Sequence, residues 1–479
     1  MFKFNNKVDI MTNKDIILAE LREFEGSTKR QWMLKGEAYY QVDNDIKDRV
    51  FYIYENEKKI LDTDRVNNKL SHADYKNQVD DKINYLLGRP YTLKCENEEY
   101  LAQVTKALGK HFIDTLNELG YEASNKGIGW LQVYLDEEGK IKTMVIPAEQ
   151  VVPIWKDRSH KELTAVIRQY EQIEYIGKER KTVKKVEYWT KETVEYYIKK
   201  ENELILDSEM YLNAGEGDLG HFTEDGLASN WGRVPFIAFK NNWLELPDLK
   251  FVKSLIDNYD LSRSEAANYV EAVQNLIYVL KGYGGEDLAE FISDLKKYRA
   301  VKIDDPAEGG LDTLTPTMDI TALKEHYEQL KRDIIESGQG VNKKFDNTGA
   351  APSGIALKFL FSGLDLKCNG LETPFKRAFE NLLYFINVFL GKKSVIEDGE
   401  EAENVEIIFN RDITINEKEA IEDCQNSKGI ISQKTILGNH PWVLDIEEEL
   451  RALEEEELSE LKALKDAVPF NKPVNDGEE

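Results

Sequence analysis

The most constraining feature of this sequence is an apolar stretch at residues 354–390, which contains a single proline, Pro374. Its apolar residues recur at helical spacing, but they lie on nearly all sides of the helix. A helix of this kind is buried on most sides, so other elements have to cover it. We predict a long core helix, capped by Ser353 and kinked at Pro374. Its apolar residues are Phe359, Leu360, Leu364, Leu366, Phe375, Phe379, Leu382, Leu383, Ile386 and Phe389.

This stretch does not fit a membrane span. Its most apolar part, residues 382–390, falls far below the ~20 residues that cross a bilayer. The first residues of the chain lack the apolar core of a signal peptide. The three cysteines, Cys95, Cys368 and Cys424, form no CxxC pair. We expect reduced thiols, an aqueous and reducing compartment, and no membrane contact.

Changes of pattern along the chain predict an α+β fold in several parts. The 479 residues correspond to about two to four domains. Alternating runs from residue 127 to 239 predict antiparallel strands, with a hairpin turn at 136–139. Residues 405–410 predict a further strand, and residues 275–319 a compact insert. Helices are predicted at residues 31–41, 71–87, 98–119, 248–274 and 320–338, and from 416 onward.

Local signals refine these helices. Ser71 and Asp74 resemble a capping box. Gly120 is predicted to end the helix at 98–119, and Gly338 the helix at 320–338. The helix at 31–41 is expected to bury Trp32, Leu34 and Tyr39. The helix at 248–274 presents one apolar face, made of Leu249, Val252, Ile256, Tyr259, Ala266, Val270 and Val273.

No catalytic constellation stands out. The six histidines lie outside any HExxH pattern, and the glycines at 282–285 match neither phosphate-loop motif. Residues 43–45 begin like a calcium loop but lack its glycine and closing glutamate. We expect a protein without catalytic activity, metal or cofactor. The alternative is a carboxylate-based hydrolase, which would require convergent acids in a deep pocket.

The charge balance limits the partners. Lys plus Arg number 63 and Asp plus Glu number 89, so the net charge is −26. Such a chain has no general attraction for phosphate or anionic lipid, so any contact with nucleic acid has to be local or weak. We interpret the acidic runs at 447–449 and 454–457 as the solvated face of an amphipathic helix. The alternative is a charged outer surface of an assembly.

Four segments, together with the order of the elements, resemble the portal proteins of tailed bacteriophages, in the family typical of long-tailed phages of Gram-positive hosts. The strongest match is residues 67–90 (NNKLSHADYKNQVDDKINYLLGRP), which are similar to the family's N-terminal helix and its Gly-x-Pro stop. The other segments are residues 127–155, 235–261 and 410–435. With the element order between them, the resemblance covers most of the chain.

The resemblance implies a homo-oligomeric ring, usually of about twelve subunits, at one capsid vertex. Double-stranded DNA would pass through its channel during packaging and ejection. The implied partners are a terminase packaging motor, the major capsid or scaffolding protein, and a head-completion adaptor. The implied location is the virion, and the host cytoplasm during assembly.

The resemblance also implies a role for each region. Residues 1–245 would form a mixed α/β wing, and 246–274 and 320–338 the two stem helices. Residues 275–319 would form a small α/β clip, and 339–352 a tunnel loop. Residues 353–392 would be the kinked spine helix of the wing, and 393–415 a wing strand. Residues 416–470 would be a helical crown, followed by an acidic tail at 471–479.

Three sets of site residues follow from these roles. The DNA-facing tunnel loop would comprise Asn342, Lys343, Lys344, Phe345, Asp346, Asn347 and Thr348. The stem candidates for lining the channel are Lys324, Lys331 and Arg332. The clip candidates for contacting partners are Tyr283, Glu286, Asp287, Asp304, Asp305 and Glu308.

The residues are compatible with a conduit. The predicted helix at 248–274 is about 40 Å long, and duplex DNA of that length carries roughly 24 phosphate charges. An acidic wall repels DNA and lets it slide, while Lys343 and Lys344 could add a ring of weak contacts. We predict that one subunit lacks the surface to bury all three long helices, so neighbours should complete the core. The alternative is an oligomeric scaffold or tail adaptor that does not conduct DNA.

Overall fold

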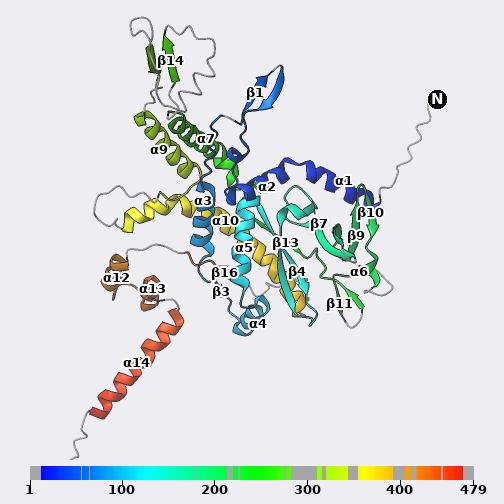
Figure 1. The fold of residues 1–479 in the computed structure, drawn as a ribbon. Coiled ribbons are helices and arrows are strands. Elements are labelled where there is room, and N and C mark those ends of the chain that lie inside the picture. The colour runs from blue at the N-terminus through cyan, green and yellow to red at the C-terminus, as the bar shows by residue number, and fades with distance from the viewer. Residues whose placement is uncertain are drawn as a thin grey trace, which may run out of the picture. The chain divides into compact units, whose positions relative to one another are not determined.

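The computed structural model describes residues 12–55, 57–63, 65–176, 179–212, 219–224, 227–273, 277–281, 310–314, 320–342, 354–391, 405–411, 417–443 and 446–467. The chain divides into two compact units (Figure 1). The first comprises residues 1–342 and 363–412, and the second residues 343–362 and 413–479. The described residues form helices and antiparallel strands, so the predicted α+β class is confirmed.

Two antiparallel sheets form the β region of the first unit, as the alternating runs predicted. Five strands pair in the order β10-β9-β8-β7-β6, and three in the order β13-β4-β5. The predicted turn joins β4 and β5, where Gly139 adopts a positive φ of 72°. The strands are β4 (Ile128–Leu135), β5 (Ile141–Ile146), β6 (Val151–Trp155), β7 (Leu163–Ile176), β8 (Glu179–Trp189), β9 (Val194–Lys200), β10 (Glu203–Leu206) and β13 (Phe236–Lys240).

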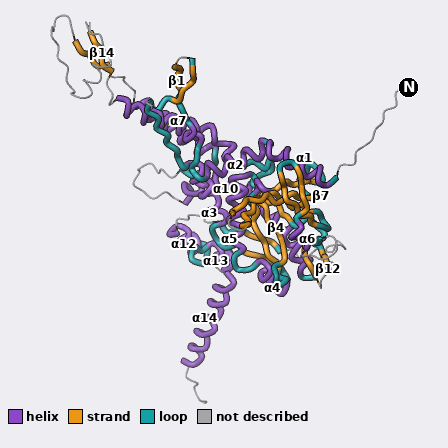
Figure 2. Tube along the Cα trace, turned by 45° about the vertical axis from the view of Figure 1, so that its right-hand side comes forward, coloured by secondary structure: helices purple, strands orange, loops and turns teal. Residues whose placement is uncertain are grey.

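One apolar cluster joins the two sheets to the N-terminal helices. It contains Trp130 of β4, Val166 of β7 and Phe236 of β13, together with Met33 of α2. Figure 2 shows the longer strands gathered in one body, from which α7 projects. The N-terminal helices are α1 (Asn13–Gly26), α2 (Thr28–Tyr40), α3 (Asp74–Leu87), α4 (Glu98–Leu108) and α5 (Phe112–Lys126).

Short strand pairs and turns complete this unit. Two of these pairs are hairpins, a third joins β14 to β15 on either side of residues 282–309, and the fourth joins β3 to β16, which lie far apart in the chain. The pairs are β1 (Tyr52–Glu55) with β2 (Lys58–Leu61), β11 (Phe222–Glu224) with β12 (Leu227–Ser229), β14 (Ile277–Lys281) with β15 (Gly310–Leu314), and β3 (Thr92–Lys94) with β16 (Glu406–Ile408). The short helices are α6 (Ser208–Leu212) and two 3-10 turns, Asp45–Asp48 and Ala148–Gln150.

The single helix predicted at 98–119 is two helices, and neither ends at Gly120. Gly109, at φ 77°, separates α4 from α5. Gly120 lies inside α5, where a Cβ would come within 2.7 Å of Leu87 and 2.9 Å of Ile83 in α3. Its missing side chain therefore permits the close packing of α3 against α5. The helix ends at Gly127, which has φ 85° and faces the Glu245 carbonyl.

Two further local predictions were wrong. Leu34 is 41% exposed, and its neighbour Met33 faces the core instead; Tyr39 is fully buried, as predicted. The cap of α3 is Ala73, without a side-chain hydrogen bond, because Ser71 donates its hydroxyl to the Val42 carbonyl. Ser71 therefore joins two loops and does not start the helix.

The long helices lie close to their predicted bounds. They are α7 (Leu249–Val273), α9 (Ile320–Ser337) and α10 (Gly354–Phe389), and α10 runs across Pro374. Leu364, Phe375, Phe379, Leu382, Leu383 and Ile386 of α10 are buried. Phe359, Leu366 and Phe389 are exposed, so burial on most sides is only partly realised within one chain.

The second unit contains α12 (Glu417–Asn426), α13 (Gln433–Asn439) and α14 (Ile446–Ala467). Ser432 caps α13 by accepting a hydrogen bond from the Thr435 N–H. The thiol of Cys424, in α12, lies 3.6 Å from the Ile436 carbonyl in α13. Glu454, Glu455, Glu456 and Glu457 of α14 are exposed, which fits the predicted solvated face.

Candidate functional site

The candidate site is built on the helix pair α7 and α9, which lie side by side in Figure 1. The Tyr259 and Tyr327 rings meet edge to face with centroids 6.3 Å apart. The Tyr327 hydroxyl donates to the Ser262 carbonyl at 3.2 Å. Lys331, one turn further along α9, lies 5.3 Å from the ring of Tyr259. Later residues of α9 therefore meet earlier residues of α7, and the two helices are antiparallel.

One lysine, Lys367 of α10, joins the beginning of α7 to the end of α9. Its ammonium lies 3.1 Å from the Asp248 carboxylate, immediately before α7. It also donates to the Gly338 carbonyl, immediately after α9, at 2.9 Å. The two helices therefore leave and re-enter the body at one place, which we call the base of the helix pair.

The base contains a buried ionic network around Asp248. Lys82 of α3 is 1% exposed and donates to Asp248 at 2.9 Å and to the Asn241 amide oxygen at 2.6 Å. Asn241 in turn donates to the other Asp248 oxygen at 2.8 Å. Burial raises the pKa of Asp248, but Lys367 and Lys82 outweigh burial and hold this pKa well below its usual range. Asp248 is therefore a carboxylate, placed where a helix N-terminus also favours negative charge.

The end of α9 is fixed by a Schellman motif. Gln339 adopts φ 51°, and the Gly340 N–H donates to the Ile335 carbonyl at 2.8 Å. Gln78 of α3 donates to the Ile334 carbonyl at 2.9 Å and lies against Gly338, where a Cβ would approach its amide oxygen to 2.1 Å. The predicted stop at Gly338 is confirmed. The left-handed residue, however, is Gln339, and Gly338 is needed for the close approach of Gln78.

The outer half of α7 buries polar side chains at a spacing of four residues. Asp260, Ser264 and Asn268 accept hydrogen bonds from the N–H groups of His72 (3.1 Å), Leu70 (2.9 Å) and Asn68 (2.6 Å), respectively. Two residues of extended chain span about 6.6 Å, and four residues of helix about 6.0 Å, so the two repeats match. The chain at 68–72 is thereby held along α7 in the opposite direction.

Asp260 makes the most contacts in this stripe. Besides the His72 N–H, it faces the His72 imidazole at 2.7 Å and accepts from the Asn44 amide at 2.6 Å. Asp260 is fully buried. These partners of the Asp260 carboxylate lie in the N-terminal 72 residues, so this part of the chain is fastened to α7.

The structure describes four of the predicted site residues. Lys324 is exposed on α9, and Asn342 is exposed after its end. Lys331 forms an ion pair with Asp74 of α3, and Arg332 donates to the Gln329 side chain at 2.8 Å. Lys331 is thus already paired within the subunit. The other predicted residues, Lys343, Lys344, Phe345, Asp346, Asn347, Thr348, Tyr283, Glu286, Asp287, Asp304, Asp305 and Glu308, lie outside the described residues.

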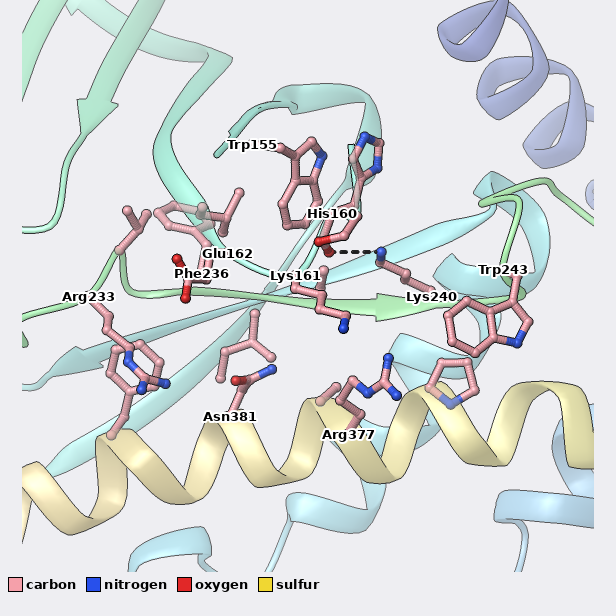
Figure 3. Close-up of a pocket in the computed structure, with 18 of the residues that line it drawn as sticks. Trp155, His160, Lys161, Glu162, Arg233, Phe236, Lys240, Trp243, Arg377 and Asn381 are labelled. Atoms are coloured by element: carbon pink, nitrogen blue, oxygen red, sulfur yellow. Dashed lines mark hydrogen bonds between the residues drawn. The ribbon is translucent and has the colours of Figure 1, made fainter. Parts of the chain in front are cut away.

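A cavity of about 490 Å³ lies between α10, β13 and the loop after β6 (Figure 3). Cationic side chains line it, among them Lys161, Arg233 and Arg377. A carboxylate-based hydrolase would need convergent acids, but most of the charged residues that line this cavity are basic. Within the described ranges, no three His, Cys, Asp or Glu side chains are close enough to hold a metal ion. A search of the same ranges finds no helix with the length and apolarity to cross a bilayer.

Sequence reasoning missed the base and the polar stripe. The stripe has a signal, since Asp260, Ser264 and Asn268 recur every four residues on one helix face. The base has none, because Lys82 pairs with Asp248, 166 positions further along the chain, and Asp248 pairs in turn with Lys367.

Comparison with known proteins identifies the family. The family of phage portal proteins described as SPP1 Gp6-like matches residues 25–462. The chain belongs to this family, and the resemblance noted in the sequence is confirmed.

Two named relatives are similar to this chain over most of its length. The portal protein of Bacillus phage SPP1 is 33% identical over 431 residues, which cover 88% of this chain and 83% of the relative. The portal protein of Clostridium phage phiCD119 is 32% identical over 461 residues, which cover 93% of this chain and 97% of the relative.

Solved structures give a weaker likeness. A chain from the neck of an empty gene transfer agent particle has a TM-score of 0.43 at 10% identity, covering 76% of this chain and 88% of that one. A chain from the native particle's virion has a TM-score of 0.39 at 12% identity with the same coverage.

Proposed function

We propose that this chain is the subunit of a portal ring at one capsid vertex, through which double-stranded DNA is packaged and ejected. Membership of the portal family over residues 25–462 carries the proposal. In the implied arrangement, α7 and α9 form the stem and line the channel. The β sheets, α10 and the N-terminal helices form the wing, and α12, α13 and α14 the crown. The ring has no catalytic role, and a separate motor hydrolyses ATP.

The exposed apolar side chains of a single subunit support assembly. Phe251 and Val270 of α7 are 52% and 64% exposed, and Leu366 of α10 is 64% exposed. Val270 belongs to the apolar face predicted for this helix, and within one chain this part of the face is uncovered. In a ring, neighbouring subunits would cover such side chains, and the subunit would gain stability from assembly.

The charge of the chain supports a channel in which DNA slides and is not held statically. A net charge of −26 per subunit gives a ring that repels DNA over most of its surface. In the proposal, Lys343 and Lys344 in the tunnel loop, with Lys324 on α9, supply weak local contacts. The clip, residues 275–319, would meet the packaging motor and later the head-completion adaptor. The assembled ring is a virion component that forms in the host cytoplasm.

Native mass, combined with particle images of the purified full-length chain, tests the ring. Twelve copies of the 55.2 kDa chain give roughly 660 kDa. We expect ring particles near this mass with an open axial channel. Rings whose axis is closed to a duplex would contradict conduction and favour a scaffold or adaptor.

Lysine neutralisation tests the DNA contact separately. We expect the double variant Lys343→Ala, Lys344→Ala to assemble normally and to change the amount or retention of packaged DNA. The double variant Lys106→Ala, Lys110→Ala, which removes two exposed lysines beside the α4–α5 turn, is the matched control. Equal packaging by both variants would contradict a tunnel-loop contact.

A further inference from the structure

In the cavity between α10, β13 and the loop after β6, basic residues outnumber acidic ones, whereas in the whole chain the acids are more numerous. Five of its lining residues are Lys or Arg, and one is an acid, Glu162. The whole chain has 63 basic and 89 acidic residues. Glu162 lies 2.5 Å from the Lys156 ammonium and therefore does not neutralise the cavity's cations. The cavity is a local positive site in an acidic protein.

Three of these cations take no part in the ion pairs that the described residues form. Across the described ranges, no carboxylate lies within 4 Å of Lys161, Arg233 or Arg377. Figure 3 shows Lys161 reaching down from the loop and Arg377 reaching up from α10, with Asn381 one turn along the same helix. Lys161, Arg377 and Asn381 thus present N–H donors to a shared space. Convergent cationic donors of this kind fit a carboxylate or another anion.

The remaining wall of the cavity is apolar. Phe236 and Val234 are buried beneath it, and Trp155 and Phe385 also line it. Trp243 stands at one end with 73% of its surface exposed, and its ring centre lies 5.5 Å from the Arg377 guanidinium. The site therefore offers an apolar floor beside cationic walls. A bare inorganic anion would leave this floor uncovered.

The loop that carries Lys161 is held in place by its neighbours. The His160 ring stacks on Trp155 at 4.9 Å with an interplanar angle of 7°, and its Nδ1 lies 2.8 Å from Glu245. Lys240 donates to the His160 carbonyl at 3.0 Å. His160 and Glu245 both adopt left-handed φ values, 51° and 53°. Non-glycine residues keep such conformations only where their surroundings enforce them, so this wall is preorganised.

We propose that this cavity is a docking site for an acidic peptide segment of a partner protein. One apolar side chain of the segment would lie on Phe236 and Trp155. Its flanking carboxylates would accept hydrogen bonds from Lys161, Arg377 and Asn381. This site is separate from the helix pair, and the inference does not depend on DNA conduction.

Duplex DNA is the less fitting occupant. DNA binding uses cations spread along an exposed surface, at the spacing of phosphates. Here the cations surround a hollow, and the floor between them is apolar. A peptide with an apolar side chain between acids matches both features.

Peptide selection against the assembled full-length protein tests the proposal. A display library of random hexapeptides is selected on the wild-type chain, and the enriched peptides are synthesised with a fluorescent label. We expect enrichment of peptides in which an aliphatic or aromatic residue is flanked by Asp or Glu. The variants Lys161→Glu and Arg377→Glu should weaken their binding at least about tenfold, as expected for lost charge-assisted hydrogen bonds. The control Lys110→Glu, an exposed lysine at the α4–α5 turn, should leave it unchanged.

Three results would overturn the proposal. One is a selection without acidic peptides, or acidic peptides that bind wild type and Arg377→Glu equally. Another is a short DNA duplex or inorganic phosphate that binds wild type more tightly than the peptides and is lost in Arg377→Glu. The third is an Asn381→Cys thiol that reacts with maleimide in the dissociated chain but is protected in the ring, since a neighbouring copy would then fill the cavity.

Discussion

The inner half of α7, up to Ile256, buries Leu249, Val252 and Ile256, whereas the outer half buries Asp260, Ser264 and Asn268. The inner half packs into the body and begins at the ionic network of Asp248. The outer half instead holds the chain at 68–72 through hydrogen bonds at every turn. Losing a buried apolar side chain costs several kcal/mol of stability, whereas a single hydrogen bond of this kind contributes about 1 kcal/mol. The same helix is therefore fixed firmly at its base and fastened locally further out.

The largest effect is expected at the base. Asp248→Ala leaves the buried ammonium of Lys82 and the partly buried ammonium of Lys367 without their shared carboxylate, and breaking a buried pair costs about 3–5 kcal/mol. Urea unfolding of the dissociated chain measures this loss. If Asp248→Ala lowered the free energy of unfolding by less than Ser264→Ala in the outer half, the base would not be the stronger anchor.

The apolar contact of the inner half comes next. Ile256 is 1% exposed, so Ile256→Ala should lower the free energy of unfolding by about 3 kcal/mol. Val270→Ala, on the exposed side of the outer half, should change the dissociated chain by less than about 0.5 kcal/mol. In the assembled ring we expect Val270→Ala to lower the stability of the assembly. An unchanged ring would mean that neighbours do not cover this side chain.

A pH dependence should distinguish the loop before α7, which contains Glu245, from the outer half of the helix. Burial alone would raise the pKa of Glu245. Lys29, His160 and Lys240 lower it by more than burial raises it, so the pKa falls to about 2 from an ordinary 4.5. Because the folded pKa is depressed, this contribution is complete above pH 4.5 and is lost as the pH falls toward 2. The contribution is roughly 3 kcal/mol. The stability gap between wild type and Glu245→Gln should therefore shrink over this range. A gap that stays constant with pH would contradict the assignment.

Among the buried side chains, the smallest effect is expected in the polar stripe. Ser264→Ala leaves the Leu70 N–H without its acceptor, at a cost of about 1 kcal/mol. Hydrogen exchange should show faster exchange at residues 68, 70 and 72, with the amides of the body unaffected. Ser262→Ala, on a neighbouring face of the helix, is the control. Global loss of protection in Ser264→Ala would show that the outer half is as integral as the base.

The sequence predicted the long elements well. The bounds of α7, α9 and α10 were predicted to within a residue or two, because apolar spacing and Gly338 mark them locally. The β region was also predicted, since antiparallel strands alternate along the chain. Gly120 was wrongly predicted to end a helix and the break at Gly109 was not predicted, because a glycine that ends a helix and one that lets two helices approach look alike in one sequence.

The site was less predictable. Lys82 lies in a helical pattern where a lysine is usually solvated, and its burial depends on Asp248 and Asn241, far along the chain. The cationic cavity is lined by Lys161, Arg233 and Arg377, which come from three separate segments, so no local sequence motif predicts it. The resemblance to portal proteins predicted the family, because it depends on the order of elements and not on any single site.

A density map of the assembled ring tests the central claim most directly. The account predicts that α7 and α9 of every subunit surround an axial opening wide enough for duplex DNA, with the Asp248–Lys82–Lys367 base at the wing end of each helix pair. A ring whose axis is closed, or one in which α7 and α9 lie on the outer surface away from the axis, would contradict it.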